Sequence, residues 1–110
     1  MNEDEIVYRA LVDAGDAGRR VVLATVIEAR GSTPRDVGSK MVIGAGDELV
    51  GTIGGGCGEA DVLEVARRVL ETGKPARVRV ELTDDEDSWS PAVCGGVMEV
   101  FVEPVEPDVE

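Results

Sequence analysis

The stretch from Leu49 to Leu82 constrains the fold more than any other part of the chain. It begins with an apolar run to Ile53, passes through the glycine-rich turn "GGGCG", and ends in the alternating segment "ARVRVEL". Between turn and alternating segment, apolar residues recur at helical spacing: Val62, Leu63, Ala66, Val69 and Leu70. Strands joined through a helix normally lie parallel, with a right-handed crossover. The sequence therefore predicts an α/β fold: a single small domain, a mixed β-sheet with a βαβ unit, and at least two helices.

The other elements follow from local patterns. Apolar spacing from Ile6 to Ala14 predicts a first helix, closed by glycines, and "VVLATVI" predicts a strand buried on both faces. Met41–Ile43 and Leu49–Ile53 form an expected hairpin, and "GGVMEVFVEP" an expected last strand. We expect one domain over residues 1–110, with a frayed, flexible tail at about 104–110.

Composition excludes several classes of protein. Hydrophobic residues make up 43% and aromatic residues only 3%, so the core must be aliphatic. A net charge of -12 argues against nucleic acid and anionic membranes as partners. The absence of His excludes imidazole base catalysis and His-ligated zinc. With no membrane-length apolar run, no signal core and two cysteines, the expected location is cytoplasmic.

The glycine turn is the first candidate site. Gly54, Gly55 and Gly56 lie where a strand ends and a helix begins, so their N–H groups can surround an anion such as a phosphate or an oxo-metal group. Cys57 follows near the helix N-terminus, where the pKa of a thiol falls and the thiolate becomes accessible. The alternative is a tight turn beside a buried, inert cysteine.

Cys94 is a second candidate. It begins "CGG" before the last expected strand, and it faces the same cavity as Cys57 if that strand neighbours the strand ending at Ile53. A reversible disulfide between Cys57 and Cys94 is one reading, and a turn with a small apolar side chain is the other.

The loop "RGSTPRDVGSK" is the third candidate. It gathers Arg30, Arg35 and Lys40 with the hydroxyls of Ser32 and Thr33 in an otherwise acidic protein. Bases grouped with hydroxyls and glycines suit an anionic small molecule. The alternative is a loop that supports the hairpin and carries surface salt bridges.

Three separated motifs together resemble a known family. "GSTPRDVGSKM", "GTIGGGCGEADV" and "CGGVMEVFVEP" are similar, in this order, to the N-terminal domain of XdhC/CoxI proteins. These are accessory factors of xanthine dehydrogenase and related molybdenum hydroxylases. The resemblance runs from about Val21 to Pro104, which is nearly the whole chain.

The resemblance implies a function and a set of site residues. Family members bind molybdenum cofactor (molybdopterin), hold it transiently for sulfuration, and deliver it to an apo-enzyme, so the chain is expected to be a carrier with no catalytic residue. Cys57 is implied to hold the cofactor through its metal. The other implied cofactor-binding residues are Gly54, Gly55, Gly56, Ser32, Pro34, Arg35, Lys40 and Cys94.

The resemblance also implies partners. The expected partner is a xanthine-dehydrogenase-type apo-enzyme, with a cysteine desulfurase, a separate Rossmann-domain chain and a homodimer as further candidates. Longer family members carry a Rossmann-like domain that we do not expect within residues 1–110, and Gly58 stands where a larger apolar residue is expected. Two other functions stay open: a thiol redox module that uses Cys57 and Cys94, and a non-catalytic docking subunit of a dehydrogenase complex. The sequence leaves open the target enzyme and the mononucleotide or dinucleotide form of the cofactor.

Overall fold

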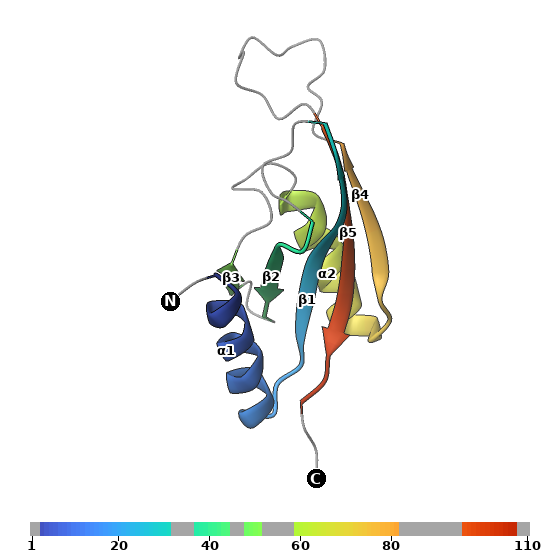
Figure 1. Ribbon diagram of the computed structural model, residues 1–110. Helices are drawn as coiled ribbons and strands as arrows, with labels where there is room; N and C mark the ends of the chain where they lie inside the picture. Colours follow the sequence, from blue (N-terminus) through green and yellow to red (C-terminus); the bar gives the residue numbers. More distant parts are fainter. Residues whose placement is uncertain (1–2, 32–36, 45–47, 52–58, 82–95, 108–110) are drawn as a thin grey trace.

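The computed structural model describes residues 3–31, 37–44, 48–51, 59–81 and 96–107 (Figure 1). These residues form two helices and five strands. In chain order the elements are α1 (Glu3–Asp16), β1 (Val21–Arg30), β2 (Lys40–Ile43), β3 (Leu49–Gly51), α2 (Glu59–Thr72), β4 (Ala76–Glu81) and β5 (Val97–Val105). The α/β class, the small compact domain and the two helices are confirmed.

The strands form one sheet in the order β3-β2-β1-β5-β4, and every neighbouring pair is antiparallel. This corrects the expected mixed sheet. The succession β3-α2-β4 exists, and both strands run in the same direction, but they occupy opposite edges of the sheet. The last strand, β5, inserts between β1 and β4, so three strands separate the two members of the expected parallel pair.

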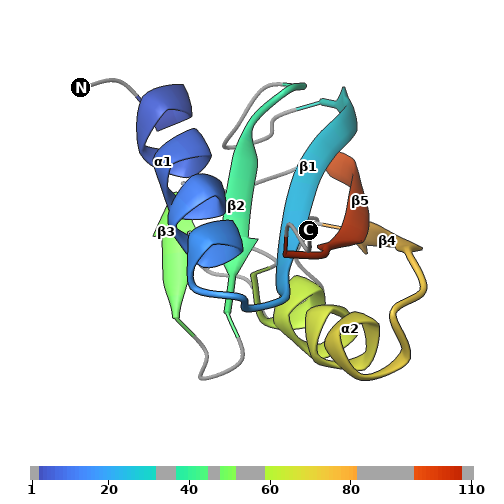
Figure 2. The ribbon, with the colours of Figure 1, turned by 90° about the horizontal axis from the view of Figure 1, so that it is seen from below.

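The helices cover opposite faces of the sheet (Figures 1 and 2). On one face α2 packs on alternate residues of β1, β4 and β5, in a core that includes Val22, Val62, Val80 and Val100. On the other face α1 packs on β2 and β3, where Val7 and Ala14 meet Val21 and Val42. The prediction that the Val21 strand is buried on both faces is therefore confirmed for its first half.

The final strand ends one residue later than expected, at Val105. Its pairing with β1 continues through Pro104 opposite Val22 and Val105 opposite Val21. Val105 packs against the core on the α1 side. The strand thus includes residues 104 and 105, at the start of the tail that was expected to be frayed, because its end pairs with the start of β1.

Both helices end on left-handed glycines. Gly18 has a φ of 73°, and the N–H groups of Arg19 and Gly18 donate to the carbonyls of Ala14 and Gly15 at 2.9 and 3.2 Å. This pairing is a Schellman motif. Gly73 has a φ of 72° and donates its N–H to Val69 at 2.8 Å, which ends α2 where the sequence predicted.

Arg20 joins three segments that are distant in the sequence. Its Nη1 donates to the Leu70 carbonyl at 2.8 Å, and its Nε lies 2.8 Å from Glu106 Oε2. α2 has no basic residue in its own last turn. Arg20 therefore supplies, from the α1–β1 connection, the positive charge that favours a helix C-terminus.

Removing this contact should destabilise the domain. We expect Arg20→Met to lower the free energy of unfolding by about 1 kcal/mol, because it leaves a helix carbonyl without its donor. Arg19→Met is the matched control. The Arg19 side chain is 57% exposed, and its ion pair with Glu48 is long, at 3.9 Å. Its removal should therefore change the free energy of unfolding by no more than about 0.5 kcal/mol. Urea unfolding measures both changes, and equal losses would contradict the capping role.

Candidate functional site

The three motif-bearing connections leave the same end of the sheet. Strands β1, β3 and β4 run toward this end, and β2 and β5 start from it. Arg30 of β1 and Glu81 of β4 both stand opposite Val97 of β5, and α2 begins at this end as well (Figure 1). The connections β1–β2, β3–α2 and β4–β5 therefore all start and finish here, although the sequence places them far apart.

Most of the sequence-predicted site residues lie outside the described residues. These are Ser32, Pro34 and Arg35 in the first connection, Gly54, Gly55, Gly56 and Cys57 in the second, and Cys94 in the third. Lys40 is the one implied cofactor-binding residue that the structure describes. Its surroundings are therefore the best starting point for a site.

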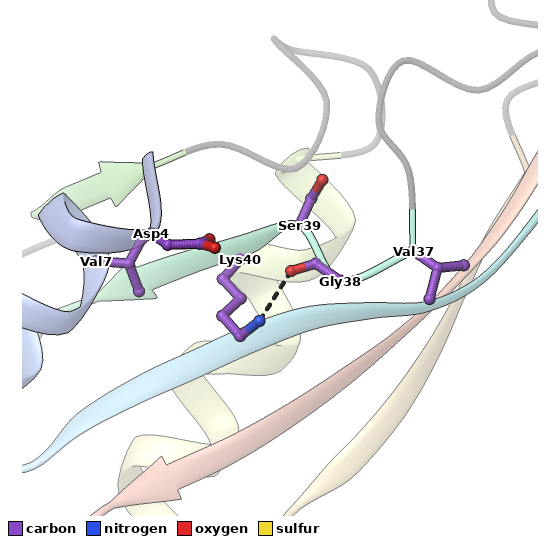
Figure 3. A pocket seen from close by; sticks show the side chains of 6 residues that line it. All are labelled: Asp4, Val7, Val37, Gly38, Ser39 and Lys40. Carbon is purple, nitrogen blue, oxygen red and sulfur yellow. Dashed lines mark hydrogen bonds between the residues drawn. The ribbon is translucent and has the colours of Figure 1, made fainter. Parts of the chain in front are cut away.

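Lys40 lines a pocket of about 360 Å³ between α1 and the start of β2 (Figure 3). Its other walls come from the first two turns of α1 and from the residues just before β2. The lining residues are Asp4, Val7, Val37, Gly38, Ser39 and Lys40. A carboxylate, an ammonium group and a hydroxyl thus meet beside two valines, which is a combination that binds a polar small molecule rather than a hydrocarbon.

Lys40 lies on the α1 side of the sheet. It alternates along β2 with Met41, which belongs to the core beneath α2, and it shares a face with Val42, which packs under α1. Its Nζ donates to the Gly38 carbonyl at 2.9 Å. The pocket is therefore on the sheet face opposite α2, although both are at the same end of the fold.

The backbone around the pocket is fixed by β1. The Val26 N–H donates to the Ser39 carbonyl at 2.9 Å, and the Gly38 N–H donates to the Val26 carbonyl at 2.8 Å. The register of β1 against β5 shifts between Val26 and Glu28. The bulge thus begins at the same residue, Val26, that holds Gly38 and Ser39 of the pocket lining against β1.

Gly51 holds the second motif-bearing connection close to the pocket. It has a φ of 84°, and a Cβ placed on it would lie 2.6 Å from the Lys40 carbonyl oxygen and 3.0 Å from Val7 Cγ2. Both the backbone conformation and the space therefore require glycine. Gly51 is the last described residue before the glycine turn, so its packing sets where that connection begins.

Substitution of Gly51 should be costly. We expect Gly51→Ala to lower the free energy of unfolding by about 3 kcal/mol, because it combines left-handed strain with a backbone clash. Gly18→Ala is the matched control. Gly18 is also left-handed but has open space around it, so only the conformational strain of about 1 kcal/mol applies. If both variants unfold at the same urea concentration, the clash with Lys40 is unimportant.

Charged side chains cover the open part of the sheet next to this end. Arg77 of β4 pairs with Glu99 of β5 at 2.7 Å, and Arg30 pairs with Glu28 within β1 at 2.8 Å. The pKa of the Glu28 carboxyl is lowered mainly by the hydrogen bond from Arg30 and next by the charge of Arg30. The charges of Arg77 and Arg79 add a smaller effect in the same direction. The pKa of Arg30 is raised by the same contact.

The pairing predicts a defined titration. We expect the pKa of Glu28 to be lower in the folded chain than unfolded, so its contribution to stability is present above the unfolded pKa and disappears as pH falls through the folded one. Arg30→Gln should raise the pKa of Glu28 toward its ordinary value. Arg79→Gln should raise it less, because Arg79 acts only at a distance. Carboxyl-carbon NMR titration reports both shifts, and a larger effect from Arg79→Gln would refute the assignment.

Sequence reasoning missed several residues of the pocket. Asp4 was not selected, because nothing in the local sequence shows that α1 crosses beside β2. Ser39 lies inside the basic loop but was not selected. A detectable signal did exist for Gly51, since a glycine that ends an apolar strand often marks close backbone approach.

Two kinds of feature are absent from the described residues. Among residues 3–31, 37–44, 48–51, 59–81 and 96–107, no three His, Cys, Asp or Glu side chains are grouped so that they could hold a metal ion. No helix in the part of the chain that the structure describes is long and apolar enough to cross a membrane. The predicted metal ligand, Cys57, falls outside these residues.

The sequence matches one family model. The model of the XdhC and CoxI family matches residues 14–81, which run from the end of α1 through β4. This range contains two of the three motifs on which the resemblance was based.

Two Escherichia coli proteins are similar in sequence. The uncharacterized protein YqeB is 35% identical over 80 residues, which are 73% of this chain and 15% of that protein. The molybdenum cofactor insertion chaperone PaoD is 29% identical over 97 residues, which are 86% of this chain and 30% of PaoD. The chain thus spans less than a third of the length of either relative.

A solved structure shares the fold. The crystal structure of a xanthine dehydrogenase from Bacillus halodurans aligns with a TM-score of 0.74 and 31% sequence identity. The alignment covers 89% of this chain and 30% of that one. The five-stranded sheet with a helix on each face is therefore found as part of a longer protein.

Proposed function

Because this chain belongs to the XdhC and CoxI family, we propose that it is a molybdenum-cofactor-binding accessory module for a xanthine-dehydrogenase-type molybdenum hydroxylase. It acts as a carrier and not as a turnover enzyme. The ligand class comes from the similarity to PaoD, whose name states that it is a molybdenum cofactor insertion chaperone.

The observation that carries the proposal is the shared origin of the three motif-bearing connections. A carrier must surround its ligand with groups from several parts of the chain, and β1–β2, β3–α2 and β4–β5 all connect at one end of the sheet. Loops gathered at one end of a rigid sheet are a common way to build a binding site. The alternative of three unrelated surface loops gives no reason for this arrangement.

The described residues fit such a ligand in their chemistry. Lys40 supplies an ammonium group, Ser39 supplies a hydroxyl, and Gly51 leaves no space for a side chain where the second connection begins. When bound, the cofactor supplies a phosphate and a molybdenum ion with affinity for sulfur. We propose that Gly54, Gly55, Gly56 and Arg35 receive the anionic part, that Ser32 and Pro34 face it, and that Cys57 is the metal ligand, with Cys94 nearby.

The finer steps follow from the same proposal. The module holds the cofactor during sulfuration and insertion, and it works with a cysteine desulfurase and the apo-hydroxylase in the cytoplasm. A Rossmann domain would act with it, either in the same protein or on a separate chain, and a homodimer is the proposed assembly.

The proposal predicts loss of molybdenum from defined variants. Protein purified from a host that makes the cofactor should contain molybdenum, whereas protein from a cofactor-deficient host should not. Cys57→Ser should lower molybdenum per chain strongly, because it replaces a soft ligand by a hard one. Cys94→Ser should lower it less. Lys40→Met should also lower it, since it removes a charge-assisted contact worth about 1–3 kcal/mol.

The second lysine of the chain provides the control. Lys74 is exposed after the end of α2, whereas Lys40 is partly buried in the pocket. Lys74→Met therefore removes the same charge without touching the site, and it should retain molybdenum at the level of the unaltered chain. Molybdenum in Cys57→Ser equal to that level would disprove the ligand role. A loss shared by both cysteine variants only under oxidising conditions would favour the thiol redox module.

A further inference from the structure

The pocket beside Lys40 has a mixed charge that a phosphate site would not need. Asp4 contributes a carboxylate from the first turn of α1, and Lys40 contributes an ammonium group from the start of β2. The two formal charges cancel. An anion placed here would be attracted by Lys40 and repelled by Asp4, so the pocket favours a neutral ligand that both donates and accepts hydrogen bonds.

Two polar groups of the pocket are available to such a ligand. Within the described part of the chain, neither the Asp4 carboxylate nor the Ser39 hydroxyl has a hydrogen-bond partner. Figure 3 shows Asp4 directed from α1 toward residues 39 and 40, while the Lys40 ammonium turns back to the Gly38 carbonyl. That bond uses one of three ammonium donors, so the other two can serve a ligand.

The shape of the pocket also restricts which ligands it can bind. Val7, which is 1% exposed, and Val37, which is 60% exposed, give it an inner and an outer apolar wall. The volume of about 360 Å³ lies at the lower end of the range for small-molecule sites. A single flat ring system fits within this space.

We infer that this pocket binds a 2-amino-4-oxopyrimidine ring, the heterocycle shared by pterins and guanine. The adjacent amino and ring N–H groups of this heterocycle donate to the two oxygens of Asp4, as a guanidinium group does. Its carbonyl oxygen accepts from Lys40, and Val7 and Val37 lie against the ring. The inference rests on the proposed function, because it assigns the ring end of the cofactor to the α1 side of the sheet.

Fluorescence titration of the whole chain with neopterin tests this assignment. Neopterin carries the ring without a phosphate, and guanosine and inorganic phosphate are the comparison ligands. We expect neopterin or guanosine to bind, and the tighter of the two identifies whether the pterin or the nucleotide part of the cofactor occupies the pocket. Inorganic phosphate should neither bind comparably nor compete.

Matched variants connect binding to the two charged residues. Asp4→Asn keeps a residue suited to a helix start but replaces an acceptor by a donor. We expect it and Lys40→Met to weaken ring binding by at least about tenfold, the effect of losing one charge-assisted hydrogen bond. Asp16→Asn, at the other end of α1, and Lys74→Met should bind like the unaltered chain. Thermal melts of all four variants verify that the fold is intact.

The outcomes separate this inference from the proposed function. If neither neopterin nor guanosine binds while the unaltered chain retains molybdenum, the pocket assignment is wrong and the carrier function stands. Ring binding that Asp4→Asn leaves unchanged, or binding of phosphate alone, would overturn the assignment as well. If the chain neither retains molybdenum nor binds the rings, both proposals fail.

Discussion

The antiparallel pairing of β1 with β5 is the constraint on which the rest of the structure depends. It runs from Val21 opposite Val105 to Arg30 opposite Val97. Because β1 is the central strand and β5 is its neighbour, their pairing decides which side chains face each helix. Residues such as Val22 and Val100 face α2, whereas Val21 and Val105 face α1. Nearly all of this core is aliphatic, so branched side chains on central strands provide most of the buried surface.

The same pairing also determines the shape of the sheet end at which β1, β3 and β4 finish. Past the bulge at Val26, β1 continues with β5, while Gly38 and Ser39 are bonded to Val26 itself. The pocket beside Lys40 lies between these residues and the first two turns of α1. Behind it, a side chain on Gly51 would collide with the Lys40 carbonyl and with Val7, which both belong to residues of the pocket lining. The position of the pocket therefore follows from strand pairing and one glycine, and not from the loops alone.

The sequence predicted the local structure of this chain better than its pairing. The apolar spacing from Val62 to Leu70, the stop at Gly73 and the hairpin of β2 and β3 were all correct, because each depends on neighbouring residues. The parallel pairing was wrong because the insertion of β5 beside β1 depends on contacts far apart in the chain. For the same reason Lys40 could be selected from a basic loop, but Asp4 could not be placed beside it. The roles of Cys57 and the glycine turn stay predictions.

The order of strands in the sheet has a consequence for biosynthesis. β5 is the last of the described strands to leave the ribosome, yet it lies second from the edge of the sheet. It connects β4 to β1, and through β1 to the hairpin of β2 and β3. Until residue 105 has emerged, β4 has no neighbour, and one side of β1 stays unpaired. The nascent chain therefore exposes an apolar sheet edge until β5 emerges, a state in which chaperones and aggregation compete. Because such distant contacts close slowly, the emergence of β5 is the event that permits the sheet to fold.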